Sequence, residues 1–357
     1  MRTGDRLRPK RPPLCLPDSG WSETSGYWTR SPLNNACHSS RRPDHRHSRC
    51  PRPRHSAPRS GETSSLPVAR LAADLTNGIT QQTPRAVEKM SRFESEQEML
   101  ACFDEGYLHV LAPVMLEIEA EARGTDYGSV SWSSRDQVER MATHLDLGND
   151  SRLLDIGAGA GWPGLYVGQQ TGCHVTMLDF PVNGLKLALD RAVRDSVAAD
   201  ASVADGVSLP FSDGVFDGVI HSDLLCCLSQ KREVLAECRR MVRSGGRMAF
   251  GVIEELPDLA PEAHTVAVES GPEYVETESP YPDLLAETGW TLSNVEDVTS
   301  EYGSMVQRLL RSRESRRTAL VALLGVEQVE DFVERNRSSI ASIEEGRLCR
   351  RIYLAEA

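Results

Sequence analysis

Short apolar runs alternate with amphipathic helical patterns along residues 152–254, and this alternation predicts parallel βαβ units. The predicted order is strand 152–156, helix 162–171, strand 174–179, helix 183–197, strand 201–205, strand 216–221, helix 229–242 and strand 247–253. Toward the C-terminus the pattern continues with helix 281–288, strand 290–298, a helical stretch 303–345 and strand 348–354. The fold class is therefore α/β with a doubly wound, Rossmann-like sheet.

The first predicted strand runs directly into a glycine-rich turn, Gly157 to Gly164, and then into a helix. Glycine has no Cβ, so it accepts positive φ and lets backbone N–H groups approach a ligand closely. We expect the helix to open at Trp162-Pro163-Gly164, because proline suits a first helical turn. The turn is typical of a site for a nucleotide-like ligand.

Two cofactors fit this turn. Gly159-x-Gly161-x-x-Gly164 also matches the dinucleotide fingerprint, in which a pyrophosphate lies on the helix N-terminus. Asp155 at the end of the strand would repel a pyrophosphate, but it suits a ligand with a cationic amine, such as S-adenosylmethionine. Asp179, at the end of the next strand, can accept both hydroxyls of a ribose and fits either cofactor.

Residues 151–254 resemble class I S-adenosylmethionine-dependent methyltransferases, in particular the bacterial small-molecule branch with a type 11-like domain. The resemblance rests on motifs in order: Leu154 to Gly161, Asp179, Val203-Ala204-Asp205-Gly206 with Leu209-Pro210-Phe211, Phe216 to Ile220, and Leu235 to Gly246. Ala158 and Ser244 depart from the residues most common in that family. The fold implied is a seven-stranded, mostly parallel sheet with helical caps and the last strand inserted antiparallel.

The same resemblance implies the residues that hold S-adenosylmethionine. Asp155 and the backbone of Gly157, Gly159 and Gly161 would hold the methionine end of the cofactor. Asp179 would hold the ribose. Asp205 with Gly206 would contact the adenine.

Two further groups are candidates for the substrate side. His221 and Asp223 follow the predicted fourth strand at its carboxyl end, where open α/β sheets bind ligands. An imidazole there could take a proton from an amine or hydroxyl, although His221 could equally serve only to hydrogen-bond the loop. Tyr127 and Trp132 could line the pocket, or belong to the core.

The composition divides the chain. Residues 1–89 hold 16 Lys and Arg against 7 Asp and Glu, with 11 of the 20 prolines, whereas residues 90–357 carry 24 against 45, a net charge of −21. We expect the first segment to be disordered, and either to precede a native start at Met90 or to act as a basic tail. Residues 90–150 would form an N-terminal helical cap, and residues 151–357 the methyltransferase domain with the helical insertion 303–345.

The remaining observations concern compartment and partners. The nine cysteines form no CxxC pair, so reduced thiols in a cytoplasm are expected. Cys37, His38, His45, His47 and Cys50 match no standard zinc spacing, and no metal is expected. No apolar run is long enough for a membrane helix. The acidic charge of residues 90–357 disfavours nucleic acid as a partner.

Three functional classes stay open from the sequence. The preferred one is an S-adenosylmethionine-dependent methyltransferase that acts on a nitrogen or oxygen of a small molecule. The others are an NAD(P)-dependent oxidoreductase and a non-catalytic S-adenosylmethionine-binding protein. The helical stretch 303–345 suits a substrate cap or a homo-oligomer contact. Five arginines in it could receive an acidic substrate or form a solvated face: Arg308, Arg311, Arg313, Arg316 and Arg317.

Overall fold

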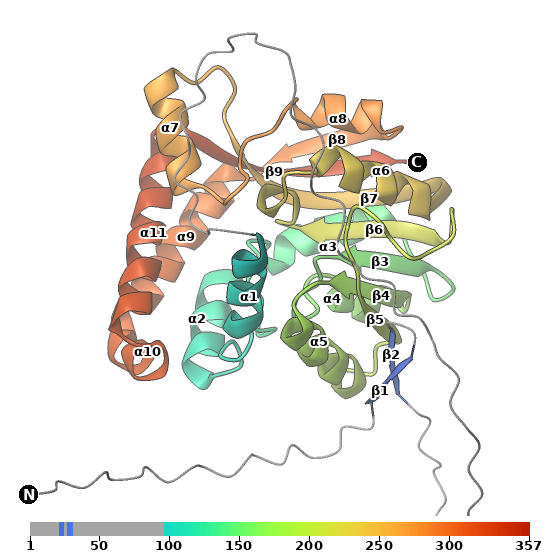
Figure 1. Ribbon diagram of the computed structural model, residues 1–357, viewed down its shortest axis with the longest axis horizontal. Coiled ribbons are helices and arrows are strands. Elements are labelled where there is room, and N and C mark those ends of the chain that lie inside the picture. The colour runs from blue at the N-terminus through green and yellow to red at the C-terminus, as the bar shows by residue number, and fades with distance from the viewer. Residues whose placement is uncertain (1–20, 25–26, 31–95) are drawn as a thin grey trace, which may run out of the picture. The chain divides into compact units, whose positions relative to one another are not determined.

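The computed structural model describes residues 21–24, 27–30 and 96–357. Within these ranges the strands form a nine-stranded mixed sheet in the order β1-β2-β5-β4-β3-β6-β7-β9-β8 (Figure 1). The strands are β1 Trp21–Thr24, β2 Tyr27–Arg30, β3 Arg152–Ile156, β4 His174–Asp179, β5 Ala199–Val203, β6 Phe216–Ser222, β7 Val242–Glu255, β8 Thr291–Asp297 and β9 Leu348–Glu356.

Helices lie between β2 and β3, alternate with the following strands and are inserted before β9. They are α1 Glu96–Gly106, α2 Pro113–Arg123, α3 Arg135–Leu145, α4 Gly164–Thr171, α5 Val182–Arg194, α6 Lys231–Met241, α7 Pro261–Ser270, α8 Tyr281–Glu287, α9 Thr299–Ser315, α10 Arg317–Leu324 and α11 Val326–Glu344. A short 3₁₀ helix, η1, spans Leu225–Cys227.

The central part of the sheet is parallel. β3 pairs in parallel with β4 and β6, β4 with β5, and β6 with β7. β9 is antiparallel to both of its neighbours, β7 and β8. The predicted α/β class is confirmed, and the last strand is inserted antiparallel as expected. The carboxyl ends of β3, β4, β5, β6 and β7 therefore meet at one edge, where ligands bind in open α/β sheets.

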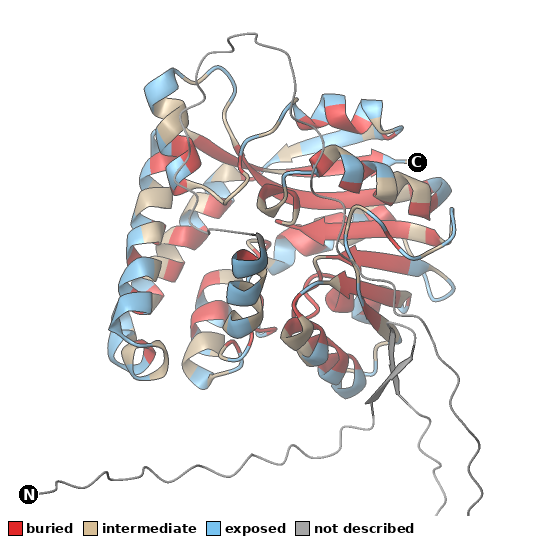
Figure 2. Ribbon diagram, in the orientation of Figure 1, coloured by how far each residue is buried: buried red, intermediate tan, exposed pale blue. Residues whose placement is uncertain are grey.

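Both faces of the sheet are covered, which explains the apolar runs in the sequence. Successive strand residues point to opposite faces. In β3, Leu154 joins one hydrophobic cluster with Phe250, and Leu153 joins a second cluster with Ile220. β3 and β6 are buried along almost their whole length (Figure 2).

Most of the predicted elements are present, with several differences. α4 begins at Gly164, so Pro163 is its N-cap residue rather than part of its first turn. The predicted strand 201–205 is shifted, which places Asp205 beyond the end of β5. The predicted stretch 303–345 is three helices, α9 to α11, and α7 had no counterpart in the predicted elements.

The N-terminal segment differs from its expectation in one respect. β1 and β2 lie within residues 1–89, for which disorder was predicted, and β2 pairs antiparallel with β5. The rest of that segment, with the cysteines and histidines considered for zinc, lies outside the described residues.

α2 packs beside α9 and α10 through a small cluster that contains Ile118, Ala122, Leu309 and Leu320 (Figure 1). In the part of the chain that the structure describes, no helix combines the length and the apolar character needed to cross a membrane.

Candidate functional site

The turn after β3 has the backbone that its glycines predict. Gly157, Gly159 and Gly161 have φ values of 71°, 51° and 93°, which are left-handed conformations that favour glycine. The N–H groups of Gly157 and Ala158 donate to the carbonyl of Leu178 at 2.8 and 3.1 Å. These two bonds fix the turn against the end of β4.

Asp155 lies beneath this turn and is fully buried. Its Oδ2 accepts a hydrogen bond of 2.9 Å from the N–H of Gly164, the first residue of α4. Its Oδ1 is also buried, and it has no hydrogen-bond partner among the described residues. Burial raises the pKa of Asp155 to about 8, and the nearby Asp179 raises it further. An unpartnered buried carboxylate oxygen is costly, so a ligand with a cationic N–H donor would complete this site.

Asp179 ends β4 and is oriented toward the same turn. Its Oδ2 accepts from the N–H of Gly159 at 2.7 Å and its Oδ1 from the N–H of Phe180 at 2.8 Å. Burial raises its pKa to about 6, although both hydrogen bonds oppose the shift. Each carboxylate oxygen has two lone-pair directions, so capacity remains for hydroxyl donors.

Asp205 and Gly206 lie two and three residues beyond β5. The Oδ1 of Asp205 accepts from the N–H of Val207 at 3.1 Å, and the side chain is otherwise exposed. A Cβ built on Gly206 would lie 3.9 Å from Ile156, the last residue of β3. The structure therefore places Asp155, Asp179 and Asp205 at one edge, near the ends of three neighbouring strands.

Tyr107, directly after α1, is part of this site and was not singled out from the sequence. Its hydroxyl lies 2.1 Å from the position that a Cβ on Gly159 would take, and its Cε2 lies 2.9 Å from the equivalent position on Gly184. The ring thus occupies a slot that only two glycines leave open. Burial raises the pKa of Tyr107 well above its usual value, with further contributions from Asp179, Cys227 and Asp155.

A second contact docks the same segment. The carboxylate of Asp104 accepts from the backbone N–H of Asn183 at 2.7 Å and from its side-chain amide at 2.9 Å. Asn183 lies in the first turn of α5, so these bonds fix the segment to the start of that helix. The helical periodicity of residues 96–111 was visible in the sequence, but nothing in it indicated which side chain would reach the glycine turn.

His221 requires a correction. It lies within β6, is fully buried, and stacks on Phe250 with ring centroids 4.7 Å apart. Burial lowers its pKa to about 3, although Asp223 opposes the shift. Both ring nitrogens are buried without partners among the described residues. This environment does not favour a base that must pick up a proton near neutral pH.

Asp223, expected from the sequence in the substrate pocket, is hydrogen-bonded within the protein. Its carboxylate accepts from the guanidinium of Arg350 at 3.0 and 3.2 Å, from the N–H of Trp132 at 2.8 Å, and from the hydroxyls of Ser131 and Ser222 at 3.2 and 2.9 Å. Arg350 itself is 0% exposed. Asp223 is therefore the centre of a buried network that ties the loop 129–134 and β9 to the end of β6.

Tyr127 and Trp132 are packing residues in this structure. Tyr127 contacts the ring of Trp162 at 5.0 Å, and the guanidinium of Arg191 lies 3.9 Å from its centroid. Trp132 makes an edge-to-face contact of 5.4 Å with Tyr302. The alternative that these aromatic residues belong to the core accounts for both contacts.

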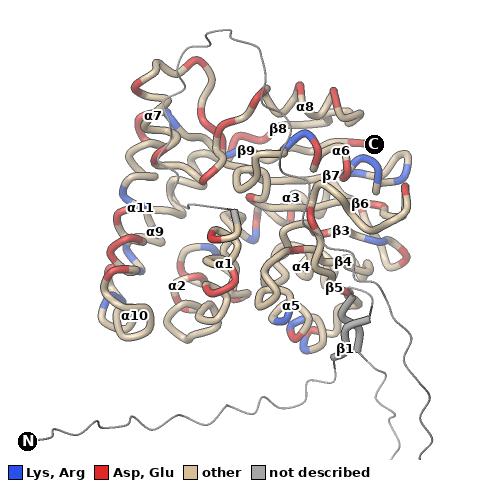
Figure 3. Tube along the Cα trace, viewed as in Figure 1, with Lys and Arg blue, Asp and Glu red and all other residues tan. Residues whose placement is uncertain are grey.

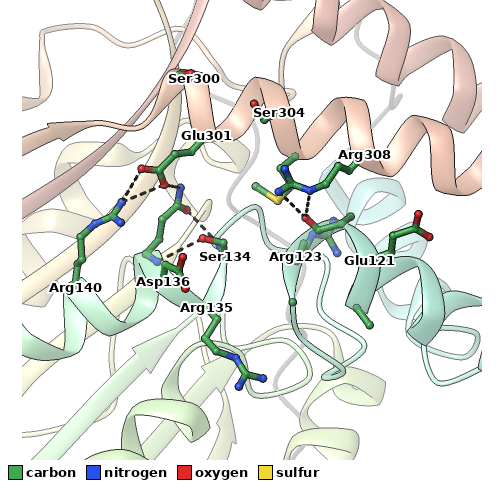
Figure 4. Close-up of a pocket in the computed structure, with 15 residues that line it drawn as sticks. Glu121, Arg123, Ser134, Arg135, Asp136, Arg140, Ser300, Glu301, Ser304 and Arg308 are labelled. Atoms are coloured by element: carbon green, nitrogen blue, oxygen red, sulfur yellow. Dashed lines mark hydrogen bonds and ion pairs between the residues drawn. The ribbon is translucent and has the colours of Figure 1, made fainter.

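A polar pocket of about 560 Å³ lies elsewhere, between the end of α2, the start of α3 and the first half of α9 (Figure 4). On one side of it, Arg140 and Gln137 donate to Glu301. On the other side, Arg308 donates two hydrogen bonds to the carbonyl of Ala122, at 3.2 and 3.0 Å.

Arg313, Arg316 and Arg317, which were also considered for an acidic substrate, contact their own protein as well, whereas Arg311 is exposed. Arg316 binds Glu117 and Glu121 of α2, and Arg317 binds Glu330 of α11. Figure 3 shows acidic and basic residues together along α9 and α11. Arg313, Arg316 and Arg317 therefore join helices to one another.

Comparison with known proteins agrees with the geometry of the glycine turn. Residues 154–250 match a family model described as a methyltransferase domain. Residues 154–250 are thus similar to a methyltransferase domain. The match covers β3 to the middle of β7, the part of the sheet that holds the glycine turn, Asp155, Asp179 and Asp205.

Among curated proteins, a phosphoethanolamine N-methyltransferase from Triticum aestivum is 23% identical over 206 residues, which are 58% of this chain and 41% of the relative. A sarcosine/dimethylglycine N-methyltransferase from Halorhodospira halochloris is 29% identical over 215 residues, 57% of this chain and 75% of the relative. This chain spans about two fifths of the length of the phosphoethanolamine N-methyltransferases that it matches.

Solved structures share the fold. Phosphoethanolamine N-methyltransferase 2 from Haemonchus contortus, in complex with S-adenosyl-L-methionine, has a TM-score of 0.58 at 17% identity and covers 71% of this chain and 59% of its own. The [4+2]-cyclase SpnF has a TM-score of 0.59 at 18% identity and covers 73% of this chain and 96% of its own. A cyclase among these structures means that the fold alone does not specify methyl transfer.

Proposed function

We propose that this chain transfers a methyl group from S-adenosylmethionine to an amine nitrogen of a small molecule. The observation that carries the proposal is the buried, unpartnered Oδ1 of Asp155 beneath the glycine turn. A dinucleotide would bring a pyrophosphate to this carboxylate, whereas S-adenosylmethionine would bring an ammonium group. The names of the relatives, which are N-methyltransferases, support a nitrogen acceptor.

In this proposal the methionine end of the cofactor binds Asp155 and the backbone of Gly157, Gly159 and Gly161. Asp179, held by the N–H of Gly159, binds the ribose, and Asp205 with Gly206 binds the adenine. Tyr107 closes over the glycine turn and excludes water from it.

When bound, S-adenosylmethionine supplies a methyl group on a sulfonium, and its transfer is an in-line displacement. Such a step needs the acceptor held close, aligned and away from water, and it does not require a dedicated acid or base. The residues at the strand ends would supply that positioning. The low pKa and complete burial of His221 fit a mechanism in which it does not act as a base.

The first test is a calorimetric titration of the full chain with S-adenosylmethionine, S-adenosylhomocysteine and NAD. Binding of the first two with none to NAD would support the proposal, and binding of NAD alone would show an oxidoreductase-type site instead. Transfer of labelled methyl groups to small amines, among them phosphoethanolamine, sarcosine and dimethylglycine, then tests the acceptor. Cofactor binding without any methylated product would favour a binding protein without this activity.

A further inference from the structure

Two neighbouring thiols lie directly after the carboxyl end of β6. Cys226 and Cys227 belong to η1, and the Sγ atoms of both donate to the carbonyl oxygen of Asp223, at 3.3 and 3.4 Å. Consecutive side chains of a 3₁₀ helix diverge by about 120°, because the helix has three residues per turn. Their convergence on one acceptor therefore places the two sulfur atoms on the same side of the turn.

The pair has an inner and an outer thiol. Cys226 is 1% exposed, whereas Cys227 is only partly buried. The hydrogen-bonding interaction between the two thiols favours the protonated form of Cys226 and, together with burial, raises its pKa well above the usual value. A reagent that reaches Cys227 from solvent therefore meets a second thiol immediately behind it.

The pair also lies next to the glycine turn. Leu224, the preceding residue, has its Cδ1 3.0 Å from the position of a Cβ on Gly157. Cys227 is close enough to Tyr107 to raise the pKa of its hydroxyl, which itself lies against Gly159. A group bound to Cys227 would therefore lie beside the residues proposed to hold the cofactor.

The spacing of the two residues selects the kind of ligand. Adjacent Cα atoms are about 3.8 Å apart, which is shorter than the roughly 4.4–6.8 Å of an unstrained disulfide. A single atom that bonds to both sulfurs relieves this constraint, because it lengthens the link between them. A ligand that two thiolates satisfy fits this pair, because in the described residues no group of three His, Cys, Asp or Glu side chains could hold a metal ion.

We propose that Cys226 and Cys227 form a dithiol site for trivalent arsenicals, and that its occupation competes with the cofactor. An arsenoxide R–As=O reacts with the two thiols to give R–As bonded to both sulfurs. Two S–H bonds and the As=O bond break, two As–S bonds form, and one water leaves. Arsenic stays trivalent, so no oxidant or reductant is needed. The dithiol site stands on the thiol geometry alone, and only the competition rests on the proposed function.

The test uses phenylarsine oxide and the full chain, with Cys15, Cys37, Cys50 and Cys102 replaced by serine in a background variant. We expect one adduct, with the mass of one phenylarsenic unit bound and two protons lost, located in the peptide that contains residues 226 and 227. A small dithiol should remove it and a monothiol should not. Cys226→Ser and Cys227→Ser should each abolish the bridged adduct, whereas Cys173→Ser, at another buried thiol, should keep it.

The second measurement is the rate of adduct formation with and without S-adenosylhomocysteine. We expect S-adenosylhomocysteine to slow adduct formation in proportion to the fraction of protein to which it is bound. Protein that carries the phenylarsenic adduct should in turn lose affinity for S-adenosylhomocysteine. An adduct that is absent, or that survives in either single variant, would overturn the dithiol site. Equal rates with S-adenosylhomocysteine bound would overturn the competition. A protein that forms the adduct but binds no S-adenosylhomocysteine would refute the proposed function and leave the dithiol site intact.

Discussion

At the scale of single residues, burial disfavours the ionised forms of Asp155 and Asp179, and more strongly for Asp155. The pKa of Asp155 is raised to about 8 and that of Asp179 to about 6, mainly because each is removed from water. A cationic group beside Asp155 would favour its ionised form. Such strongly shifted carboxyl groups at a strand edge are typical of functional sites.

We predict that Asp155→Asn abolishes cofactor binding and yet stabilises the protein in mild alkali. A carboxyl group whose pKa is raised by folding binds more protons in the folded state, so its contribution to stability falls as the pH rises from about 4 to about 8. Asparagine does not titrate, so the variant does not lose stability at this position as the pH rises. The difference in melting temperature, variant minus parent, should therefore be a few degrees larger at pH 8 than at pH 4.5. A difference that does not change with pH would contradict the assignment.

Asp179→Ala is expected to weaken the binding of S-adenosylhomocysteine by at least about tenfold, because hydrogen bonds to a charged group contribute about 1.5–3 kcal/mol. Calorimetry measures the affinity, and circular dichroism checks that the fold is intact. Asp190→Ala, at an exposed position on α5, is the matched control and should leave the affinity unchanged. Unchanged affinity in Asp179→Ala would remove the ribose assignment.

At the scale of elements, the segment from α1 to Leu111 is held over the glycine turn by a few contacts. Tyr107 fills the slot between Gly159 and Gly184, and Asp104 binds the start of α5. Val110 packs with Tyr107 and Ala160 in a small separate cluster. Few buried contacts mean that this segment opens more easily than the sheet beneath it.

We predict that Gly184→Ala loosens this segment. The new Cβ would lie 2.9 Å from the ring of Tyr107 and 3.1 Å from the backbone of Gly159. Overpacking of this kind costs about 1–3 kcal/mol, so amide hydrogen exchange in residues 96–111 should accelerate about tenfold. Gly106→Ala is the control, because nothing lies within 4 Å of its Cβ position. Equal exchange in the two variants would show that the slot does not hold the segment.

At the scale of the whole molecule, Arg350 joins parts of the chain that are far apart in sequence. Besides Asp223, its guanidinium donates to Gln137 at 2.9 Å and to Ser133 at 2.8 Å. Four parts of the chain, namely the loop before α3, α3 itself, the end of β6 and β9, therefore meet at one buried charge. Burying a charge is tolerated only when it is paired and hydrogen-bonded, as it is here.

Arg350→Met should destabilise the protein by about 3–5 kcal/mol, because it leaves the buried Asp223 without its partner. Thermal and urea denaturation would measure the loss. Arg351→Met, at a neighbouring position with a partly exposed side chain, should have a much smaller effect. The double variant Arg350→Met with Asp223→Leu should recover part of the stability, because it removes both charges. A double variant as unstable as the sum of the two single ones would contradict this account.

The sequence by itself determined the elements and their order, because apolar periodicity and glycine positions are local properties of the chain. It placed β3, β4 and β6 within a residue of their observed bounds. It also placed Asp155 and Asp179 at the ends of neighbouring strands, since parallel strands expose their carboxyl ends on one edge.

Only the tertiary structure decided which of the remaining polar residues are free to act. His221 and Asp223 looked alike in the sequence as strand-end groups. Burial lowers the pKa of His221, and Arg350, 127 residues away in the chain, binds the carboxylate of Asp223. Tyr107 reaches the glycine turn only because α1 docks on α5. Burial and pairing of this kind depend on contacts between distant segments, and no local pattern of residues encodes them.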